Sequence, residues 1–476
     1  MLNKFRTYPI LKIMLKNKKI IPQLNSKIIF LAILYLSIII LSPMIARENM
    51  IAILMVAGVL GIVALVFFRD KLYLGFPLII ISSLLIPFSI STGTQTSINT
   101  SIMISFMLMG AWILDIVVFK QPAPKFSSKV EMLAIAFAAN TILAFGFGQF
   151  NWYPTKAASF FAQTGQSMLF VLSAIVFLVG GYKFKESKWI QWTVNIFIIV
   201  GGLYSLGFLI PPLRPYINRI FQRAVIDSMF WSWLIILSFS QSLLNKKLSP
   251  STRIIFMVIS ASALFNVFIT RQSWVSGWFP AVVGIFVVLL LYNPRLAAIA
   301  ALLFASLFVI RFQLLQSYIL VGDNEYSMLS RWEAWKIIFE IIKKNPVFGV
   351  GPANYYYYTP FYNILGYHVQ FNSHNNYLDI IAQTGLIGLV LFLWWFLEIG
   401  KMGFSLLKEK LTAFEHSFTI AVLGGLSASL VAAMLGDWII PFIYNIGMEG
   451  FRSAVLGWLF FGGLLFIRKK YSSVED

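Results

Sequence analysis

The sequence predicts an all-α polytopic membrane protein with about 12–14 transmembrane helices and one large outer loop that contains an amphipathic helix. Hydrophobic residues make up 59% of the 476 residues, and charged residues make up only 12%. An ordinary soluble domain carries about 25% charged residues. The apolar residues are also gathered into runs that approach the roughly 20 residues a helix needs to cross a bilayer. These two observations exclude a soluble globular protein.

The apolar runs define the candidate membrane spans. They lie at residues 28–45, 50–68, 72–90, 101–119, 131–150, 167–182, 190–210, 228–244, 253–269, 274–291, 296–315, 377–399, 417–436 and 450–467. A basic segment precedes the first run, and no small-residue cleavage site follows it. We therefore interpret residues 28–45 as an uncleaved first helix and not as a signal peptide.

Basic residues recur at every second connection between these runs. The basic connections are residues 4–27, 69–71, 120–129, 183–188, 246–253, 295, 401–410 and 468–470. Lysine and arginine are retained in cytoplasmic loops, so this side is predicted to be cytoplasmic. The loops also account for the net charge of +19. No nucleic-acid-binding motif accompanies the charge, and we expect no nucleic-acid partner.

The alternation predicts five parts. Residues 1–27 form a basic cytoplasmic N-terminus, 28–315 the transmembrane helices before the large loop, and 316–376 the large extracytoplasmic loop. Residues 377–467 form the C-terminal transmembrane helices and 468–476 a cytoplasmic tail. Both termini are then cytoplasmic, and the large loop lies outside.

The large loop begins with an amphipathic helix. Ser330 and Glu333 fit a capping box, and a stripe of apolar residues follows at helical spacing. The stripe comprises Trp332, Trp335, Phe339 and Ile342. This pattern predicts a helix on the membrane surface with its tryptophans inward. Arg331 would lie in the first turn, where free amides and the helix dipole already favour an anion, so a bound phosphate would explain the arginine.

Arginines are also unusually frequent on the predicted outer side. They are Arg214, Arg219, Arg223, Arg271, Arg311 and Arg331. Any one of them alone could extend to lipid headgroups. Six together favour an anionic substrate at the outer face, because arginine binds phosphate through two parallel hydrogen bonds.

His374 is the candidate general base. It follows Ser373 and lies just before the apolar run that starts at residue 377, which places it at the mouth of a transmembrane helix. The helix dipole there would lower its pKa and keep the imidazole neutral, able to accept a proton. His368 and His416 are more simply interpreted as loop residues.

The order of these motifs resembles the core of the O-antigen ligase/polymerase family. The matching residues are Arg331 and Trp335, then Pro346, Gly349 and Gly351, then His374, Asn375, Tyr377 and Leu378, then Thr384 to Gly388. Upstream, Thr270-Arg271-Gln272-Ser273 resembles the Thr-x-Ser-Arg element of that family, with the arginine displaced. From about Arg219 onward the likeness is in motifs, and before that only in general hydropathy.

The resemblance implies a glycan transferase of the bacterial inner membrane, with its active loop on the periplasmic or extracellular side. Its donor would be a glycan linked to a polyprenyl diphosphate, and its acceptor a glycan, a lipid or a protein. The charge that develops on the leaving diphosphate requires cations already in place. Arg331, Arg219 and Arg271 are the first candidates, with Arg223 and Arg214 next, and His374 would be the catalytic base. We expect no metal ion and no cofactor, since the sequence has no Asp-x-Asp motif, Walker loop or His/Cys cluster.

Several alternatives stay open at the level of sequence. A polymerase and a ligase share these motifs, with a slight preference for the polymerase. A lipid-linked oligosaccharide flippase is a second class, although it needs a polar central cavity that the apolar spans do not indicate. A non-catalytic assembly component is a third. Tyr355 to Tyr358 fit either stacking on sugars or interfacial anchoring.

Overall fold

The computed structural model describes residues 69–91, 97–271, 274–310 and 323–472. The chain separates into two compact units, Met1–Asp70 and Lys71–Asp476, and almost all of the described residues belong to the second. The candidate spans at 28–45 and 50–68, and Arg311, lie outside the described residues.

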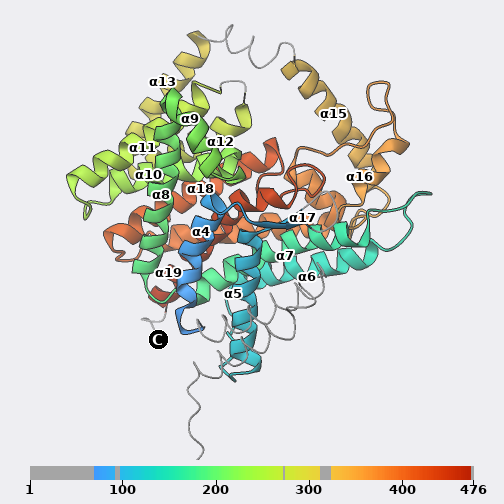
Figure 1. Ribbon diagram of the computed structural model, residues 1–476, viewed down its shortest axis with the longest axis horizontal. Coiled ribbons are helices and arrows are strands. Elements are labelled where there is room, and N and C mark those ends of the chain that lie inside the picture. The colour runs from blue at the N-terminus through green and yellow to red at the C-terminus, as the bar shows by residue number, and fades with distance from the viewer. Residues whose placement is uncertain (1–68, 92–96, 272–273, 311–322, 473–476) are drawn as a thin grey trace, which may run out of the picture. The chain divides into compact units, whose positions relative to one another are not determined.

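The described residues are almost entirely helical (Figure 1). The longer helices are α4 (Gly75–Leu85), α5 (Thr100–Val117), α6 (Lys129–Phe147), α7 (Phe160–Lys183), α8 (Ser187–Leu209), α10 (Ser228–Leu244), α11 (Pro250–Phe268), α12 (Val275–Tyr292), α13 (Pro294–Ile310), α15 (Asp323–Ile342), α17 (Asn376–Leu406), α18 (Ala413–Leu435) and α19 (Phe451–Ser472). The short ones are η1 (Arg69–Leu74), η2 (Pro211–Leu213), α9 (Arg214–Ile220), η3 (Arg223–Ile226), α16 (Tyr355–Tyr358), η4 (Thr359–Phe361) and η5 (Met448–Gly450).

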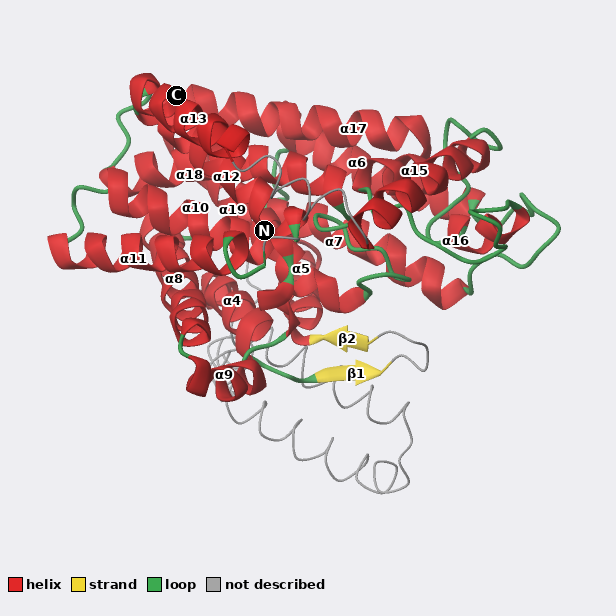
Figure 2. Cartoon of the chain, turned by 90° about the horizontal axis from the view of Figure 1, so that it is seen from above, coloured by secondary structure: helices red, strands yellow, loops and turns green. Residues whose placement is uncertain are grey.

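Two short strands are the exception within the described ranges (Figure 2). The strand β1 (Ser89–Ser91) pairs antiparallel with β2 (Ser97–Asn99), and Ile90 lies opposite Ile98. The side chain of Asn99 then caps α5 by accepting from the amides of Ser101 and Ile102.

The fold class predicted from the sequence is confirmed. Every candidate span that falls in the described ranges coincides with a helix. Nine of the helices described there are long and apolar enough to cross a membrane, and three shorter apolar helices accompany them. The protein is therefore an all-α polytopic membrane protein.

The last helix, α19, packs at the centre of the described bundle, against α7, α10, α18 and α4. Its first turn carries Arg452, which is 1% exposed. The guanidinium donates to the carbonyl oxygens of Ser82 at 2.8 Å and Ile86 at 3.0 Å and pairs with Glu449 at 2.6 Å. Arg452 thus satisfies carbonyl groups at the end of α4, where the helix leaves them unpaired.

The helix of the large loop differs from its prediction in two respects. It begins at Asp323, so Ser330 and Arg331 lie inside the helix and the predicted capping box is wrong. The predicted apolar stripe is also divided, since Trp332 and Phe339 are 57% and 49% exposed whereas Ile342 is buried. Ile342 shares the face that packs against the rest of the protein with Ala334, Ile337, Ile338 and Ile341. Their 3- and 4-residue spacing defines one continuous helix face.

Candidate functional site

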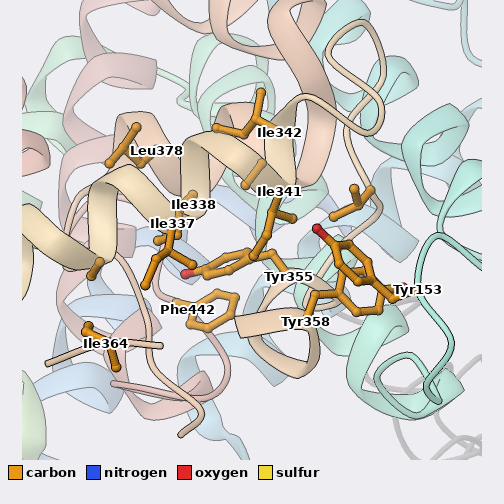
Figure 3. Packing of buried hydrophobic residues seen from close by; sticks show 13 residues of the cluster. Tyr153, Ile337, Ile338, Ile341, Ile342, Tyr355, Tyr358, Ile364, Leu378 and Phe442 are labelled. Atoms are coloured by element: carbon orange, nitrogen blue, oxygen red, sulfur yellow. The ribbon is translucent and has the colours of Figure 1, made fainter. Parts of the chain in front are cut away.

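The buried face of α15 packs in a hydrophobic cluster with residues of the large loop, of α17 and of the connection between α18 and α19. Tyr355, Tyr358, Leu378 and Phe442 belong to this cluster (Figure 3). The rings of Tyr355 and Phe442 stack with centroids 4.9 Å apart. Three separate segments of the chain therefore pack against one another: α15, the short helix Tyr355–Tyr358, and the connection between α18 and α19.

A second set of contacts joins residues 346–350, the segment that contains Pro346 and Gly349, to α17. Gly385 interrupts α17 with φ 72°, and the segment 346–350 lies along the break. The amide of Leu386 donates to the Pro346 carbonyl at 2.8 Å, and that of Val350 donates to the Ala382 carbonyl at 2.9 Å. A Cβ on Gly385 would overlap the Val347 carbonyl. The motif with Pro346 and Gly349 and the motif Thr384–Gly388 thus pack directly against each other.

The chain just before α17 is held by polar side chains. Ser373 donates to the carboxylate of Asp379 at 2.7 Å, and Tyr355 donates to the same oxygen. The indole of Trp335 donates to the Ser373 carbonyl at 2.8 Å, and Asn375 caps α17. His374, between these anchors, has φ 47°, a left-handed conformation that its tightly bonded neighbours maintain.

Arg331 and His374 line the same pocket, whose volume is about 290 Å³. The other lining residues are Ser330, Ala334, Tyr356, Ile364, Gln370, Phe371, Asn372 and Tyr444. The pocket is therefore formed by α15, by the end of the large loop, and by the connection between α18 and α19. The structure brings together the two residues that the sequence singled out as catalytic.

Arg331 presents a partly unsatisfied guanidinium to this region. One of its terminal nitrogens donates to the Leu435 carbonyl at 3.4 Å. Its Nε is buried and has no hydrogen-bond partner among the described residues. Burial lowers the pKa of Arg331, while the Asp437 carboxylate acts in the opposite direction. A buried donor without a partner is costly, so an anion that accepted from Arg331 would be strongly favoured.

His374 is neutral at physiological pH. Burial lowers its pKa to about 4, and the positive charge of Arg331 contributes to the same shift. Burial and Arg331 both favour the neutral imidazole, whereas the sequence-based argument invoked the helix dipole. The Nδ1 atom lies 3.5 Å from the amide nitrogen of Asn445, which donates to Asp437 at 2.7 Å.

Asp437, Tyr444 and Asn445 all come from the connection between α18 and α19, which the sequence analysis did not single out. The side chain of Asn376 holds this connection by accepting from the Ile439 amide at 2.9 Å and donating to the Ile440 carbonyl at 2.7 Å. Burial raises the pKa of Asp437. The available signal was the presence of these polar residues in an otherwise apolar connection.

Two of the predicted outer arginines form a second group. The guanidinium carbons of Arg214 and Arg271 each lie 5.1 Å from the ring centroid of Phe208. Arg214 also donates to the Phe208 carbonyl at 2.7 Å. Arg271 lies near Trp274, whose ring is 6.2 Å from that of Trp438, the residue after Asp437. A chain of aromatic contacts therefore leads from this arginine pair toward the residues beside the pocket.

The remaining two arginines are not in either group. Arg219 at the end of α9 and Arg223 in η3 are exposed. Arg223 is close enough to Asp227 to oppose the effect of burial, which raises the pKa of that carboxyl to about 7. Neither lines the pocket with Arg331 and His374.

A family model described as O-antigen ligase matches residues 251–393. The match runs from the start of α11 into α17 and includes Arg271, Arg331 and His374. It ends before the connection that carries Asp437 and Asn445. A comparison with curated proteins found no match.

Proposed function

We propose that this protein, whose residues 251–393 match the O-antigen ligase family model, acts as a membrane glycan ligase or polymerase. In this proposal it transfers a glycan from a polyprenyl-diphosphate carrier to an acceptor hydroxyl at the outer face of the bacterial inner membrane. The proposed orientation places the large loop outside and both termini in the cytoplasm, following the distribution of lysine and arginine. The reaction is metal-independent in this proposal, because arginine side chains supply the cations.

The transfer is a substitution at the anomeric carbon of the donor's first sugar. The acceptor oxygen forms a bond to this carbon while the bond from the carbon to the diphosphate oxygen breaks. The electron pair of the broken carbon–oxygen bond leaves with the polyprenyl diphosphate. The acceptor's hydroxyl proton passes to the imidazole of His374. A neutral imidazole is required for this step, and burial together with Arg331 keeps His374 neutral.

Arg331 binds the leaving diphosphate next to the reacting bond. Its buried Nε has no partner among the described residues, so the guanidinium retains a donor for a phosphate oxygen. Such a preorganised donor stabilises charge as it develops in the transition state. Arg271 and Arg214 form a second cationic position around Phe208, where we assign further diphosphate contacts. Arg219 and Arg223, being exposed, attract the anionic carrier from a distance.

The observation that carries this proposal is the shared pocket of Arg331 and His374. The test is carbohydrate profiling of a deletion strain, complemented with the wild-type chain or with His374→Ala. We expect the deletion to lose the mature glycan and to regain it only with the wild-type chain. Loss of long chains identifies a polymerase, whereas long chains left on the carrier lipid identify a ligase. An unchanged glycan profile in the deletion strain contradicts the proposal.

A further inference from the structure

The pocket has a second wall, which the proposed transfer step does not use. It consists of Tyr356, Gln370, Phe371, Asn372 and Tyr444, and we call it the aromatic–amide wall. The rings of Tyr356 and Tyr444 stack with centroids 4.7 Å apart and planes 16° apart. This wall therefore combines flat aromatic side chains with two amide side chains.

Neighbouring rings hold the tyrosine pair in place. Tyr357 packs edge-on against Tyr444 at 5.5 Å, and Phe442 lies 6.2 Å from Tyr356. Phe442 in turn stacks on Tyr355, whose hydroxyl is bonded to Asp379. A side chain fixed in this way loses little entropy when a ligand binds, so the wall is preorganised.

The chemistry of the wall is neutral. Arg331 and His374 are the ionisable residues among the pocket's lining apart from the two tyrosines, and the proposed mechanism assigns both to the reacting groups. Gln370 and Asn372 have no hydrogen-bond partner among the described residues. Each amide offers both donors and an acceptor. A ligand that matches this wall has one apolar face and several hydroxyl groups, and no charge that needs pairing.

We propose that the aromatic–amide wall is a subsite for the terminal sugar of a glycan acceptor. A sugar ring presents axial C–H groups to an aromatic face and its hydroxyl groups to amides. With its ring against Tyr356 and Tyr444, the acceptor directs one hydroxyl toward His374. This inference rests on the proposed function, and it selects a sugar acceptor over a protein or a lipid chain. The volume, about 290 Å³, lies at the low end for ligand pockets, and so fits the end of a glycan and not a long segment.

Two measurements on the purified full-length protein test the subsite. The first is saturation-transfer NMR with an oligosaccharide released from the cell's own surface glycan, which has no carrier lipid. The second is transfer from extracted lipid-linked donor, with the same oligosaccharide as acceptor. The variants are Tyr444→Ala, Tyr356→Ala and Gln370→Ala, and Tyr356→Phe retains the ring. Tyr367→Ala is the matched control, because Tyr367 lies in the same loop, is 64% exposed and does not line the pocket.

We expect each alanine variant to weaken oligosaccharide binding and to raise the acceptor KM by about 3–10-fold. The donor KM and the kcat should stay within about twofold of wild type. Tyr356→Phe, which keeps the aromatic ring, should restore most of the oligosaccharide binding that Tyr356→Ala loses, and Tyr367→Ala should behave as wild type. A raised donor KM with an unchanged acceptor KM would assign the wall to the donor and overturn the inference. So would wild-type oligosaccharide binding in all three alanine variants.

The two proposals fail in different ways. If the protein transfers glycan but the wall variants keep a normal acceptor KM, the subsite is wrong and the proposed function stands. If wild type binds the oligosaccharide, loses it in Tyr444→Ala, and yet transfers nothing, the subsite stands and the transferase assignment is wrong. Preferential binding of a peptide acceptor that competes with the oligosaccharide would also contradict the choice of a sugar.

Discussion

The side-chain nitrogen of Asn445 lies 3.5 Å from Nδ1 of His374. The same nitrogen donates to the Asp437 carboxylate at 2.7 Å, so Asn445 is held firmly on its far side. The contact with His374 is at the long limit for a hydrogen bond. A contact of this length orients the imidazole only weakly, so the single lone pair of the neutral ring is not committed to Asn445 and can take the acceptor's proton.

Asn445→Ala should lower kcat by about 10–100-fold while donor binding stays normal. Removing a residue that orients a functional side chain through a hydrogen bond typically costs about 10–100-fold in activity, and we expect a similar loss here. The measurement is the transfer rate at saturating donor and acceptor. Asn363→Ala serves as the control, because Asn363 is an exposed asparagine of the large loop that does not line the pocket. A proportional loss of donor binding would show that Asn445 shapes the pocket and does not act through His374.

Arg331→Lys should lose most of the transfer activity although the charge is retained. Lysine lacks the planar fork that binds phosphate through two hydrogen bonds, and it cannot replace the buried Nε donor. The comparison is Arg214→Lys, which removes a contact to the Phe208 carbonyl in the second arginine group and should have a smaller effect. Full activity of Arg331→Lys at normal protein level would show that Arg331 only contacts lipid headgroups and does not bind the diphosphate.

The pKa of His374 should depend on Arg331. A positive neighbour disfavours the imidazolium form, so its removal in Arg331→Gln must raise the pKa from about 4 toward the ordinary value of about 6.5. The chain has three histidines, and NMR titration of labelled rings can follow each of them. The acid limb of activity in wild type should likewise lie near the lowered pKa.

The control for this titration is Lys336→Gln. Lys336 is on the same helix but is exposed and paired with Glu333, and its removal should leave the His374 titration unchanged. Equal His374 titrations in wild type and Arg331→Gln would show that the two side chains do not interact.

Gly385→Ala should destabilise the protein far more than Gly366→Ala. Both glycines have positive φ, 72° and 92°, a backbone conformation that strains alanine by about 1–3 kcal/mol. At Gly385 the added Cβ would also overlap the Val347 carbonyl, whereas nothing lies within 4 Å of the Cβ position at Gly366. Thermal unfolding of the purified variants measures the difference. Equal melting temperatures would mean that the contact between segment 346–350 and α17 contributes nothing to stability.

Much of this architecture could be predicted from the sequence because it depends on local pattern. Apolar runs gave the helices, and the run after residue 376 placed His374 immediately before α17. The start of α15 was mispredicted, because a Ser-x-x-Glu pattern at Ser330 and Glu333 is compatible with a helix interior as well as with a helix start. Residues 323–329 extend the helix upstream, and the pattern at Ser330 does not reveal that.

The composition of the pocket could not be predicted, because tertiary packing assembles it. Tyr444 and Asn445 approach His374 only because Asn376 bonds to the Ile439 amide and Ile440 carbonyl. Gln166 on α7 fixes the same connection through the Pro441 carbonyl and the Ile443 amide. These partners are far apart in the chain, and no local periodicity links them.

The most direct test of the central claim is the transfer rate of purified His374 variants with extracted lipid-linked donor. His374→Ala should accumulate normally, bind the donor, and transfer glycan about 10²–10⁴-fold more slowly than wild type. His374→Gln can donate a hydrogen bond to the acceptor but cannot take its proton at neutral pH, so it should be equally slow. Near-normal turnover by His374→Gln would show that His374 only orients the acceptor. Near-normal turnover by His374→Ala would contradict the catalytic assignment of the pocket.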